Sequence, residues 1–357
     1  MGILADVELM MLLAFSGYCF LSYLLLKSPF HWHQYPSMTF RAQNVAHRAG
    51  GGEAHENTLN AVLRSVCNGV DMVELDLHLT SDGKVVVAHE DHLLRLAGVN
   101  KYISKLPYKK LPLLRKQIQN ETDPDVKSPV AQSAEERRIP LLEEIFQNLR
   151  YLPVNIDIKQ NNDKLIKEVN RMLIEYEREQ CTVWGNEDEE VNAKLYAMNS
   201  NVHLFFSSTR VVRLLFLFYT GLLPFIPMKE RFLEIPMLAS VTEYYPEVRK
   251  KFGIFSKLVM QLGDALLLSP VLFDHLSRRK MHVFIWVLNK DEQFKRAFEL
   301  GATAAMTDYP TRLAEYLLHN PPREPVEFPR LEAVAAGLEK AKEEVTNLYP
   351  EVSNLRA

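Results

Sequence analysis

Two acidic residues stand two positions apart in a segment rich in aliphatic residues, VELDLHL at residues 73–79. The side chains of a strand alternate between its two faces, so Glu74 and Asp76 share one face, where their negative charges repel each other. A divalent cation bound between the two carboxylates would make this arrangement favourable, because hard cations prefer oxygen ligands. The alternative is that both acids point into solvent while the aliphatic residues between them fill the core.

Polar side chains also stand at the ends of neighbouring segments with strand-like composition. His47 and Arg48 follow QNVA, and His89 closes KVVVAH. Asp157 and Lys159 share one face of the segment NIDIK. Two histidines can act as general base and general acid, and an arginine and a lysine suit the negative oxygens of a phosphate. These residue types are the ones that a metal-assisted reaction of a phosphate would use.

The elements that must position these residues alternate between strands and helices. We predict strands at 43–47, 71–77, 84–89, 153–158, 181–184, 202–206, 282–288 and 302–307. Helical periodicity is present at 56–69, 163–179 and 290–301. Eight strands with intervening helices favour a TIM (β/α)8 barrel of the α/β class, in which polar groups at the C-terminal ends of the strands face the active site. A doubly wound sheet fits the pattern as a second choice.

The N-terminal segment is predicted to be an uncleaved transmembrane anchor. Leu9–Leu26 are 18 uncharged residues, which make a helix of about 27 Å. Acidic residues precede this segment where a signal peptide would carry basic ones, and no small-residue cleavage site follows it. Lys27 and Arg41 follow it, which favours a barrel on the cytosolic side. A buried helix of a soluble protein is the alternative.

Two stretches exceed a minimal barrel. Residues 90–140 form a long polar connection, typical of a functional or mobile insertion. Residues 211–227, VVRLLFLFYTGLLPFIP, are almost uniformly apolar, but Gly221 and Pro224 interrupt them. Because a bilayer cannot separate the strands of a closed barrel, we predict that this stretch associates with the membrane without crossing it. A buried helix and loop after the sixth strand is the alternative. The domains are then an anchor at 1–30, a barrel at 41–318, and a tail at 319–357 with a linker and a peripheral helix.

The composition is that of an ordinary folded protein. The chain has 357 residues, and its net charge of -3 gives no indication of a nucleic-acid partner. Cys19, Cys67 and Cys181 are odd in number and widely spaced, so they indicate neither a disulfide framework nor a zinc cluster.

The order of the motifs resembles the glycerophosphodiester phosphodiesterase (GDPD) family. The residues that carry the resemblance are His47-Arg48, Glu56-Asn57-Thr58, Glu74-Leu75-Asp76, Asp82-Gly83, His89, Ile158-Lys159, Trp286 and Thr307-Asp308. Each motif is short, but together they follow the family's order from residue 43 to about 318. The anchor and the segments TVWGN, GLLPFIP and MTDYPT look closer to the membrane-associated members, which are similar to lysophospholipase D enzymes.

The resemblance implies a TIM barrel, a divalent metal (Mg²⁺ or Ca²⁺) and hydrolysis of a phosphodiester with glycerol on one arm. Position by position, the implied roles are acid and base for His47 and His89, metal ligand for Glu74, Asp76, Asp157 and His89, phosphate binding for Arg48 and Lys159, and substrate pocket for Trp286. Three positions depart from the family pattern. His-Arg-Ala replaces His-Arg-Gly, His-Glu replaces His-Asp, and Asp157 replaces a glutamate, so that its bond to the metal can run through water.

The implied activity is that of a membrane-bound lysophospholipase D. Its substrates would be lysophospholipids of the lysophosphatidylcholine or N-acyl lysophosphatidylethanolamine type, and its products lysophosphatidic acid and the free head group. The implied location is the membrane of the endoplasmic reticulum or the perinuclear region. Hydrolysis of deacylated substrates such as glycerophosphocholine is the alternative, and a non-enzymatic scaffold would require a degraded site.

Overall fold

The computed structural model describes residues 2–30, 33, 35, 40, 42–120, 127–149, 152–238, 240, 256–321 and 343. The strands are β1 (Asn44–Ala46), β2 (Met72–Leu79), β3 (Val85–Val87), β4 (Val154–Ile158), β5 (Thr182–Gly185), β6 (His203–Leu204), β7 (Phe232–Pro236), β8 (His282–Trp286) and β9 (Ala304–Thr307). The α-helices are α1 (Gly2–Lys27), α2 (Leu59–Cys67), α3 (Leu94–Ala97), α4 (Leu142–Asn148), α5 (Asp163–Glu175), α6 (Glu189–Met198), α7 (Ser208–Tyr219), α10 (Ser256–Leu267), α11 (Pro270–Arg278), α12 (Asp291–Glu299) and α13 (Pro310–His319).

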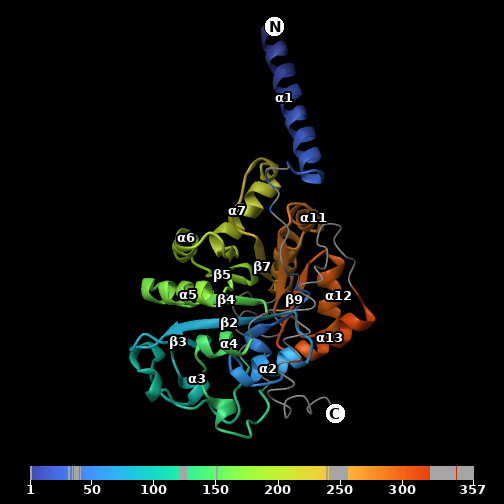
Figure 1. The fold of residues 1–357 in the computed structure, drawn as a ribbon. Coiled ribbons are helices and arrows are strands. Elements are labelled where there is room, and N and C mark those ends of the chain that lie inside the picture. Colours follow the sequence, from blue (N-terminus) through green and yellow to red (C-terminus); the bar gives the residue numbers. More distant parts are fainter. Residues whose placement is uncertain are drawn as a thin grey trace.

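Eight parallel strands form the wall of a barrel (Figure 1). Their order is β6-β5-β4-β2-β1-β9-β8-β7, and each neighbouring pair is parallel. The two ends of the sheet meet at a parallel bridge between Phe205 and Phe232, and the N–H of Phe206 donates to the carbonyl oxygen of Phe232 at 3.0 Å. This nearly closed parallel sheet confirms the predicted (β/α)8 barrel and excludes the doubly wound sheet.

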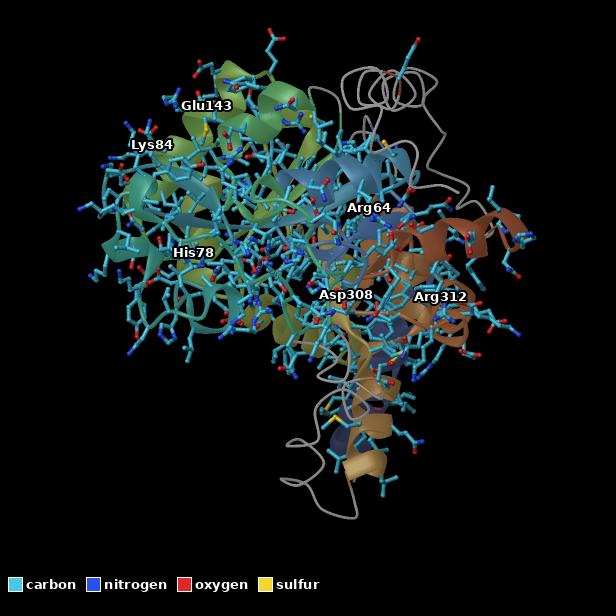
Figure 2. All side chains as sticks on the ribbon, turned by 90° about the horizontal axis from the view of Figure 1, so that it is seen from below. Arg64, His78, Lys84, Glu143, Asp308 and Arg312 are labelled. Carbon is cyan, nitrogen blue, oxygen red and sulfur yellow. The ribbon has the colours of Figure 1, made fainter. Side chains whose placement is uncertain are left out.

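One member of the predicted set of barrel strands was wrong. The segment predicted at 84–89 forms β3, which pairs antiparallel with the end of β2, so that Leu79 faces Val85 and Leu77 faces Val87. It therefore makes a hairpin that leaves the barrel: Figure 2 shows Lys84, in the turn before β3, at the edge of the molecule. The eighth barrel strand is β7, which sequence analysis missed because Glu234 and the terminal proline break its aliphatic pattern.

The alternation of side chains along β2 decides where its two acids point. Val73, Leu75 and Leu77 belong to the apolar cluster between the strands and the surrounding helices. Met72, on the opposite face, belongs to the cluster inside the barrel, which also contains Phe232. Because residues two apart share a face, Glu74 and Asp76 point into the barrel with Met72. The solvent-facing alternative for this acid pair is therefore excluded.

The long connection at 90–140 is largely packed in its described parts, 90–120 and 127–140. Short helices, among them α3, lie against β3 and share a small apolar core. The buried residues of this core are Val86, Ala88, Leu93, Leu96, Ile103, Leu114, Ile118 and Ile139. The connection is thus a folded cap on the hairpin, and its residue Asn120 reaches Asp308 at the end of β9.

The two apolar stretches have different structures. In the part of the chain that the structure describes, Asp6–Lys27 is the one helix long and apolar enough to cross a membrane, and its α1 helix projects from the body (Figure 1). Residues 211–227 form the C-terminal part of α7 and a 3-10 turn at Leu223–Phe225, so no single helix covers them. The predicted linker and helix of the tail lie outside the described residues, apart from 319–321 and 343.

Phe232 should be essential for closing the barrel. Its fully buried ring stacks on His282 at 4.8 Å between ring centres and packs edge-on against Phe284 at 5.3 Å. Phe232→Ala is expected to lower the free energy of unfolding by about 3–5 kcal/mol, because the cavity cannot be refilled. Urea denaturation in detergent, followed by the fluorescence of the buried Trp184, measures this. Leu318→Ala on the exposed surface of α13 is the control and should change stability by less than about 0.5 kcal/mol.

Candidate active site

A cavity of about 460 Å³ opens at the carboxyl ends of the barrel strands. The structure brings all eight predicted site residues to its wall: His47, Arg48, Glu74, Asp76, His89, Asp157, Lys159 and Trp286. Seven of them come from the carboxyl-terminal parts of β1, β2 and β4, the residues that follow these strands, and the end of the β3 hairpin. Trp286 ends β8 and is 38% exposed, which is the highest exposure of an aromatic residue in the cavity wall. Residues from four strands and one hairpin thus share a single site.

Neighbouring strands hold two carboxylates around one ammonium group. The register of β2 and β4 places Asp76 directly beside Asp157. Lys159 Nζ lies 2.9 Å from Asp76 Oδ1 and 2.5 Å from Asp157 Oδ2. Burial acts against ionisation of Asp76, but Lys159, His89 and Arg48 together hold its pKa well below its usual range. Asp76 is therefore a permanent anion at the base of the cavity.

Glu74 has a different balance of charges. Its Oε2 accepts the backbone N–H of Arg48 at 2.7 Å. Burial and then repulsion by Asp76 raise its pKa well above the usual value, against the attraction of Lys159. The pKa values of these two acids on one strand face are therefore shifted in opposite directions, and a further cation between them would favour the ionised form of Glu74.

The turn after β1 gives Arg48 its place. Arg48 and Ala49 have φ angles of 49° and 61°, in the left-handed region that non-glycine residues seldom adopt. This turn aims the backbone N–H of Arg48 at Glu74 and its side chain at Glu56, with Nη1 3.3 Å from Glu56 Oε1. Arg95 of α3 holds the other side of Glu56, at 2.6 Å from Oε1 and 2.9 Å from Oε2. The buried guanidinium of Arg48 is thus held by Glu56, and Glu56 is itself held by its ion pair with Arg95.

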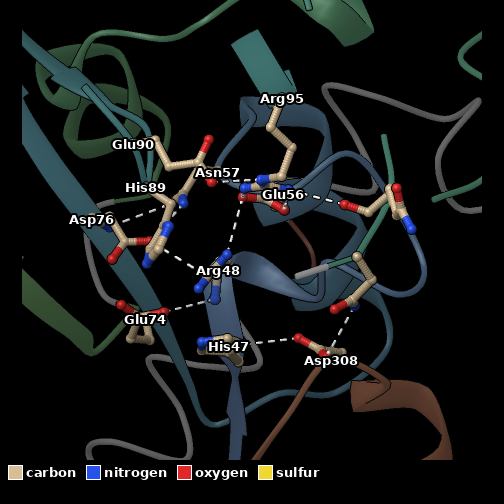
Figure 3. Close-up of polar contacts among 12 residues, drawn as sticks. His47, Arg48, Glu56, Asn57, Glu74, Asp76, His89, Glu90, Arg95 and Asp308 are labelled. Carbon is tan, nitrogen blue, oxygen red and sulfur yellow. Dashed lines mark hydrogen bonds and ion pairs between the residues drawn. The ribbon is translucent and has the colours of Figure 1, made fainter. Parts of the chain in front are cut away.

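The two histidines reach the cavity from different elements. His47 follows β1, and its Nδ1 lies 2.8 Å from Asp308 Oδ1. The other oxygen of Asp308 accepts hydrogen bonds from Asn120 at 3.1 Å and Asn289 at 3.0 Å. His89 follows the antiparallel β3 and lies beside Asp76 in Figure 3. A carboxylate on one ring nitrogen fixes the orientation and tautomer of a histidine, so His47 is prepared for proton transfer through the other nitrogen.

Sequence analysis gave no role to three polar residues of the site. Asp308 was noted only within a Thr-Asp motif, although an acid directly after the last strand was a signal that it faces the cavity. Asn57 was noted in the same way, and its Nδ2 donates to Asp76 Oδ2 at 2.7 Å. Glu234 lies on the missed strand β7 and accepts from Asn155 Nδ2 of β4 at 2.7 Å. Burial raises the pKa of Glu234 to about 8, while the bond from Asn155 lowers it.

Solved structures share this fold. The chain superposes on a phosphodiesterase from Oleispira antarctica, solved with its product sn-glycerol-3-phosphate, with a TM-score of 0.54 and 19% identity over 78% of this chain and 97% of that one. A glycerophosphodiester phosphodiesterase from Thermotoga maritima gives a TM-score of 0.51 and 18% identity over 76% and 97% of the two chains. These likenesses show that the chain has the TIM-barrel fold of these proteins.

Sequence comparison names the family. The model of the glycerophosphoryl diester phosphodiesterase family matches residues 47–312, and the chain belongs to this family. It is therefore a phosphoric diester hydrolase. Human lysophospholipase D GDPD1 is 44% identical over 307 residues, which cover 85% of this chain and 95% of that protein. Human lysophospholipase D GDPD3 is 34% identical over 87% and 95% of the two chains.

The family is generally dependent on a divalent metal, and the residues present fit such an ion in type. Glu74, Asp76 and Asp157 offer only oxygen atoms, which hard cations prefer. Asp157 Oδ1 is buried and has no hydrogen-bond partner within the described part of the chain. Among the same residues no three acid, histidine or cysteine side chains converge into a ready-made metal site, because Lys159 lies between Asp76 and Asp157. The three carboxylates are thus suitable metal ligands by chemical type, while Asp76 and Asp157 are spaced to bind the ammonium group of Lys159 between them.

Glu234 should make the stability of the metal-free protein depend on pH. Its pKa is raised to about 8 in the fold and has its ordinary value in the unfolded chain, so unfolding releases a proton between those values. Its contribution to stability is therefore full at acidic pH and is lost as the pH rises towards 8. Glu234→Gln keeps the acceptor for Asn155 and cannot ionise. In urea denaturation with EDTA, the free energy of unfolding of the variant relative to that of the wild type should rise by a few kcal/mol between about pH 5 and pH 8. Parallel stability curves would contradict this.

Proposed function

We propose that the protein is a membrane-bound lysophospholipase D that converts lysophospholipids into lysophosphatidic acid and the free head group. One observation carries the proposal. The same cavity is lined by the charged residues at the carboxyl ends of the strands and by apolar residues, among them Val211 of α7, Leu267 of α10 and Trp286. The charged residues would bind a glycerophosphate group, and the apolar residues would bind an acyl chain. The relatives named as lysophospholipase D, up to 44% identical, support this choice.

We propose the following division of roles in the site. His47 and His89 serve as the base and acid pair, because each stands at the cavity with an acid beside it. Arg48 and Lys159 bind the phosphate oxygens, and both are already held in place by carboxylates. Trp286 forms the rim that the head group or glycerol passes. Asp308 is a positioning residue that acts through His47.

The metal would be held by Glu74, Asp76 and Asp157, with His89 close by. When bound, a divalent ion polarises the phosphodiester and neutralises part of its charge. Mg²⁺ and Ca²⁺ are the candidates, because both take oxygen ligands. Lys159 would then turn from Asp76 and Asp157 towards the phosphate, as the ion takes over the neutralisation of the two acids.

Proton transfer in the reaction needs two groups on opposite sides of phosphorus. One histidine removes a proton from the attacking oxygen, which forms a new bond to phosphorus. If that oxygen belongs to water, lysophosphatidic acid forms directly; if it belongs to the 2-hydroxyl of the substrate glycerol, a cyclic phosphate forms first and is opened by a second attack of water. The bond from phosphorus to the head-group oxygen breaks, and the other histidine gives that oxygen its proton. Arg48 and Lys159 stabilise the negative charge that grows on the remaining phosphate oxygens.

We propose that α1 anchors the enzyme and that residues 211–227 rest on the membrane. The domains would be the anchor at 1–30, the barrel at 41–318 and the tail at 319–357. The apolar, largely exposed helix at Asp6–Lys27 supports the anchor. Lys27 after the helix supports a barrel on the cytosolic side, and a membrane of the endoplasmic reticulum or perinuclear region is the proposed location.

Loss of either histidine should reduce turnover without loss of the fold. His47→Ala and His89→Ala are each expected to lower kcat by about 10²-fold or more, because proton transfer loses its donor or acceptor. Asp308→Asn should also lower kcat, but should add no further loss in the His47→Ala background, because Asp308 acts through that ring. Assays on lysophosphatidylcholine with circular dichroism as the folding control measure this. Near-normal activity of either folded alanine variant would remove that histidine from the mechanism.

Removal of the metal should abolish activity, and Glu74 should be required for its return. EDTA is expected to stop turnover, and added Mg²⁺ or Ca²⁺ to restore it in the wild type. The same ion should raise the melting temperature of the wild type, because it binds only the folded state. Glu74→Gln should lose both effects, yet be at least as stable without metal, since its repulsion of Asp76 is gone. Full activity of metal-stripped protein would refute the metal-dependent mechanism.

A further inference from the structure

Two helices beside the cavity expose apolar faces next to each other. The exposed large apolar side chains include Val212, Phe216 and Tyr219 on α7 and Leu258, Leu262 and Leu266 on α10, while the charged Arg213 of α7 is also exposed. Their spacing of three or four residues places each set on one side of its helix. The hydroxyl of Tyr219 donates to the carbonyl oxygen of Leu266 at 2.7 Å, which joins the two sets. We call these six residues the α7–α10 surface.

The opposite sides of both helices are buried in the same core. Leu214 and Leu217 of α7 and Leu267 of α10 belong to one apolar cluster. In α10 the exposed residues between 258 and 266 carry no charge, and the single acid there, Asp264, is buried. A helix that faces water normally alternates apolar and charged sides. The outer side of α10 carries four exposed large apolar residues and, apart from Gln261, no exposed polar side chain between 258 and 266, which indicates that this side does not face water.

The anchor shows which environment covers this surface. Near the end of α7, the hydroxyl of Ser22 donates to the carbonyl oxygen of Gly221 at 2.7 Å, and Tyr18 donates to that of Thr220. Ser22 and Tyr18 lie five and nine residues before Lys27, so the end of α7 is level with a point about 7–14 Å inside the helix. If Lys27 marks the membrane surface, this end of α7 lies within the lipid leaflet.

The hydroxyls of Ser22 and Tyr18 provide hydrogen bonds that backbone carbonyl groups need inside a lipid leaflet. The last carbonyl groups of a helix have no partner within it, and in a bilayer no water can satisfy them. Ser22 and Tyr18 supply these partners from an otherwise apolar anchor. Gly221 has a φ of +76°, and a side chain there would meet Ser22 Oγ at 2.9 Å, so the contact is close on both sides.

The inner edges of α7 and α10 form part of the cavity wall. Val211 lies one residue before the exposed Val212, and Leu267 one residue after the exposed Leu266. On both helices the α7–α10 surface is therefore directly adjacent in sequence to a residue that lines the cavity. Lys159 and Asp76 line the same cavity.

We infer that the α7–α10 surface lies in the lipid leaflet beside α1, and that the acyl chain of the substrate passes between α7 and α10 into the cavity. The inference rests on the proposed function for its substrate and on α1 for its depth. The occupant of the surface is bilayer lipid. The phosphate of the lysophospholipid then arrives at Arg48 and Lys159 while its acyl chain remains between Val211 and Leu267.

A fluorescence measurement tests the depth of the surface without any assay of activity. In a full-length chain with its three cysteines changed to alanine, Phe216→Cys and Leu262→Cys are labelled with bimane and reconstituted into phosphatidylcholine vesicles that contain doxyl-labelled lipid. Strong quenching of both labels is expected. Leu318→Cys, 80% exposed on α13, is the matched control and should remain unquenched. Equal quenching at all three positions, or none at residues 216 and 262, would overturn the inference.

An activity ratio tests the route of the acyl chain. Phe216→Glu with Leu262→Glu should lower cleavage of vesicle-bound lysophosphatidylcholine by roughly tenfold, because two carboxylates are expelled from the leaflet, and leave cleavage of glycerophosphocholine within about twofold. Leu318→Glu should change neither. If the double variant keeps the wild-type ratio of lysophosphatidylcholine cleavage to glycerophosphocholine cleavage, the acyl chain does not pass between α7 and α10. If the wild type cleaves only glycerophosphocholine, the proposed function fails, and the quenching measurement still decides whether the surface lies in lipid.

Discussion

The site depends on the neutralisation of two acids that β2 directs into the barrel. Asp76 and Glu74 cannot both be ionised in a buried space without cations nearby. Lys159 from the strand β4 and Arg48 from the turn after β1 supply them. These cations follow the two strands that flank β2. The two acids are therefore neutralised only when β1, β2 and β4 are paired in this order.

A second layer of charges connects this centre to the cap at 90–140. Arg48 is held by Glu56, and Glu56 by Arg95, which belongs to the cap. Asn120, also in the cap, binds Asp308, the partner of His47. Ion pairs with so little exposure are strengthened by the low dielectric around them, but loss of one residue leaves its partner charged, buried and unpaired, which is costly. The cap is therefore part of the site's construction, although it contributes no strand to the barrel.

The sequence predicted those features that local periodicity carries. Period two placed Glu74 and Asp76 on one face of VELDLHL, and Asp157 and Lys159 on one face of NIDIK; the structure places all four in the cavity wall. Strand partners and direction are not local properties. The hairpin of β3 therefore looked like a barrel strand, and β7 was hidden by Glu234. The residues that sequence analysis left without a role act through such non-local pairs: Asp308 is 261 residues from His47.

If α1 is a membrane anchor, as proposed, its contacts with the C-terminal end of α7 determine how this enzyme meets its substrate. A catalytic domain on a loose tether samples lipid from the aqueous side and must extract each molecule. Hydroxyls of Tyr18 and Ser22 on consecutive carbonyl groups, with the backbone of Leu26 bound by His275 of α11, leave no such freedom. In the membrane-anchored enzyme proposed above, the barrel would therefore keep one orientation as the anchor diffuses. The encounter with substrate would then be a two-dimensional search, in which the rate follows the mole fraction of substrate in the leaflet, and inert lipid would slow the enzyme by dilution at constant bulk concentration.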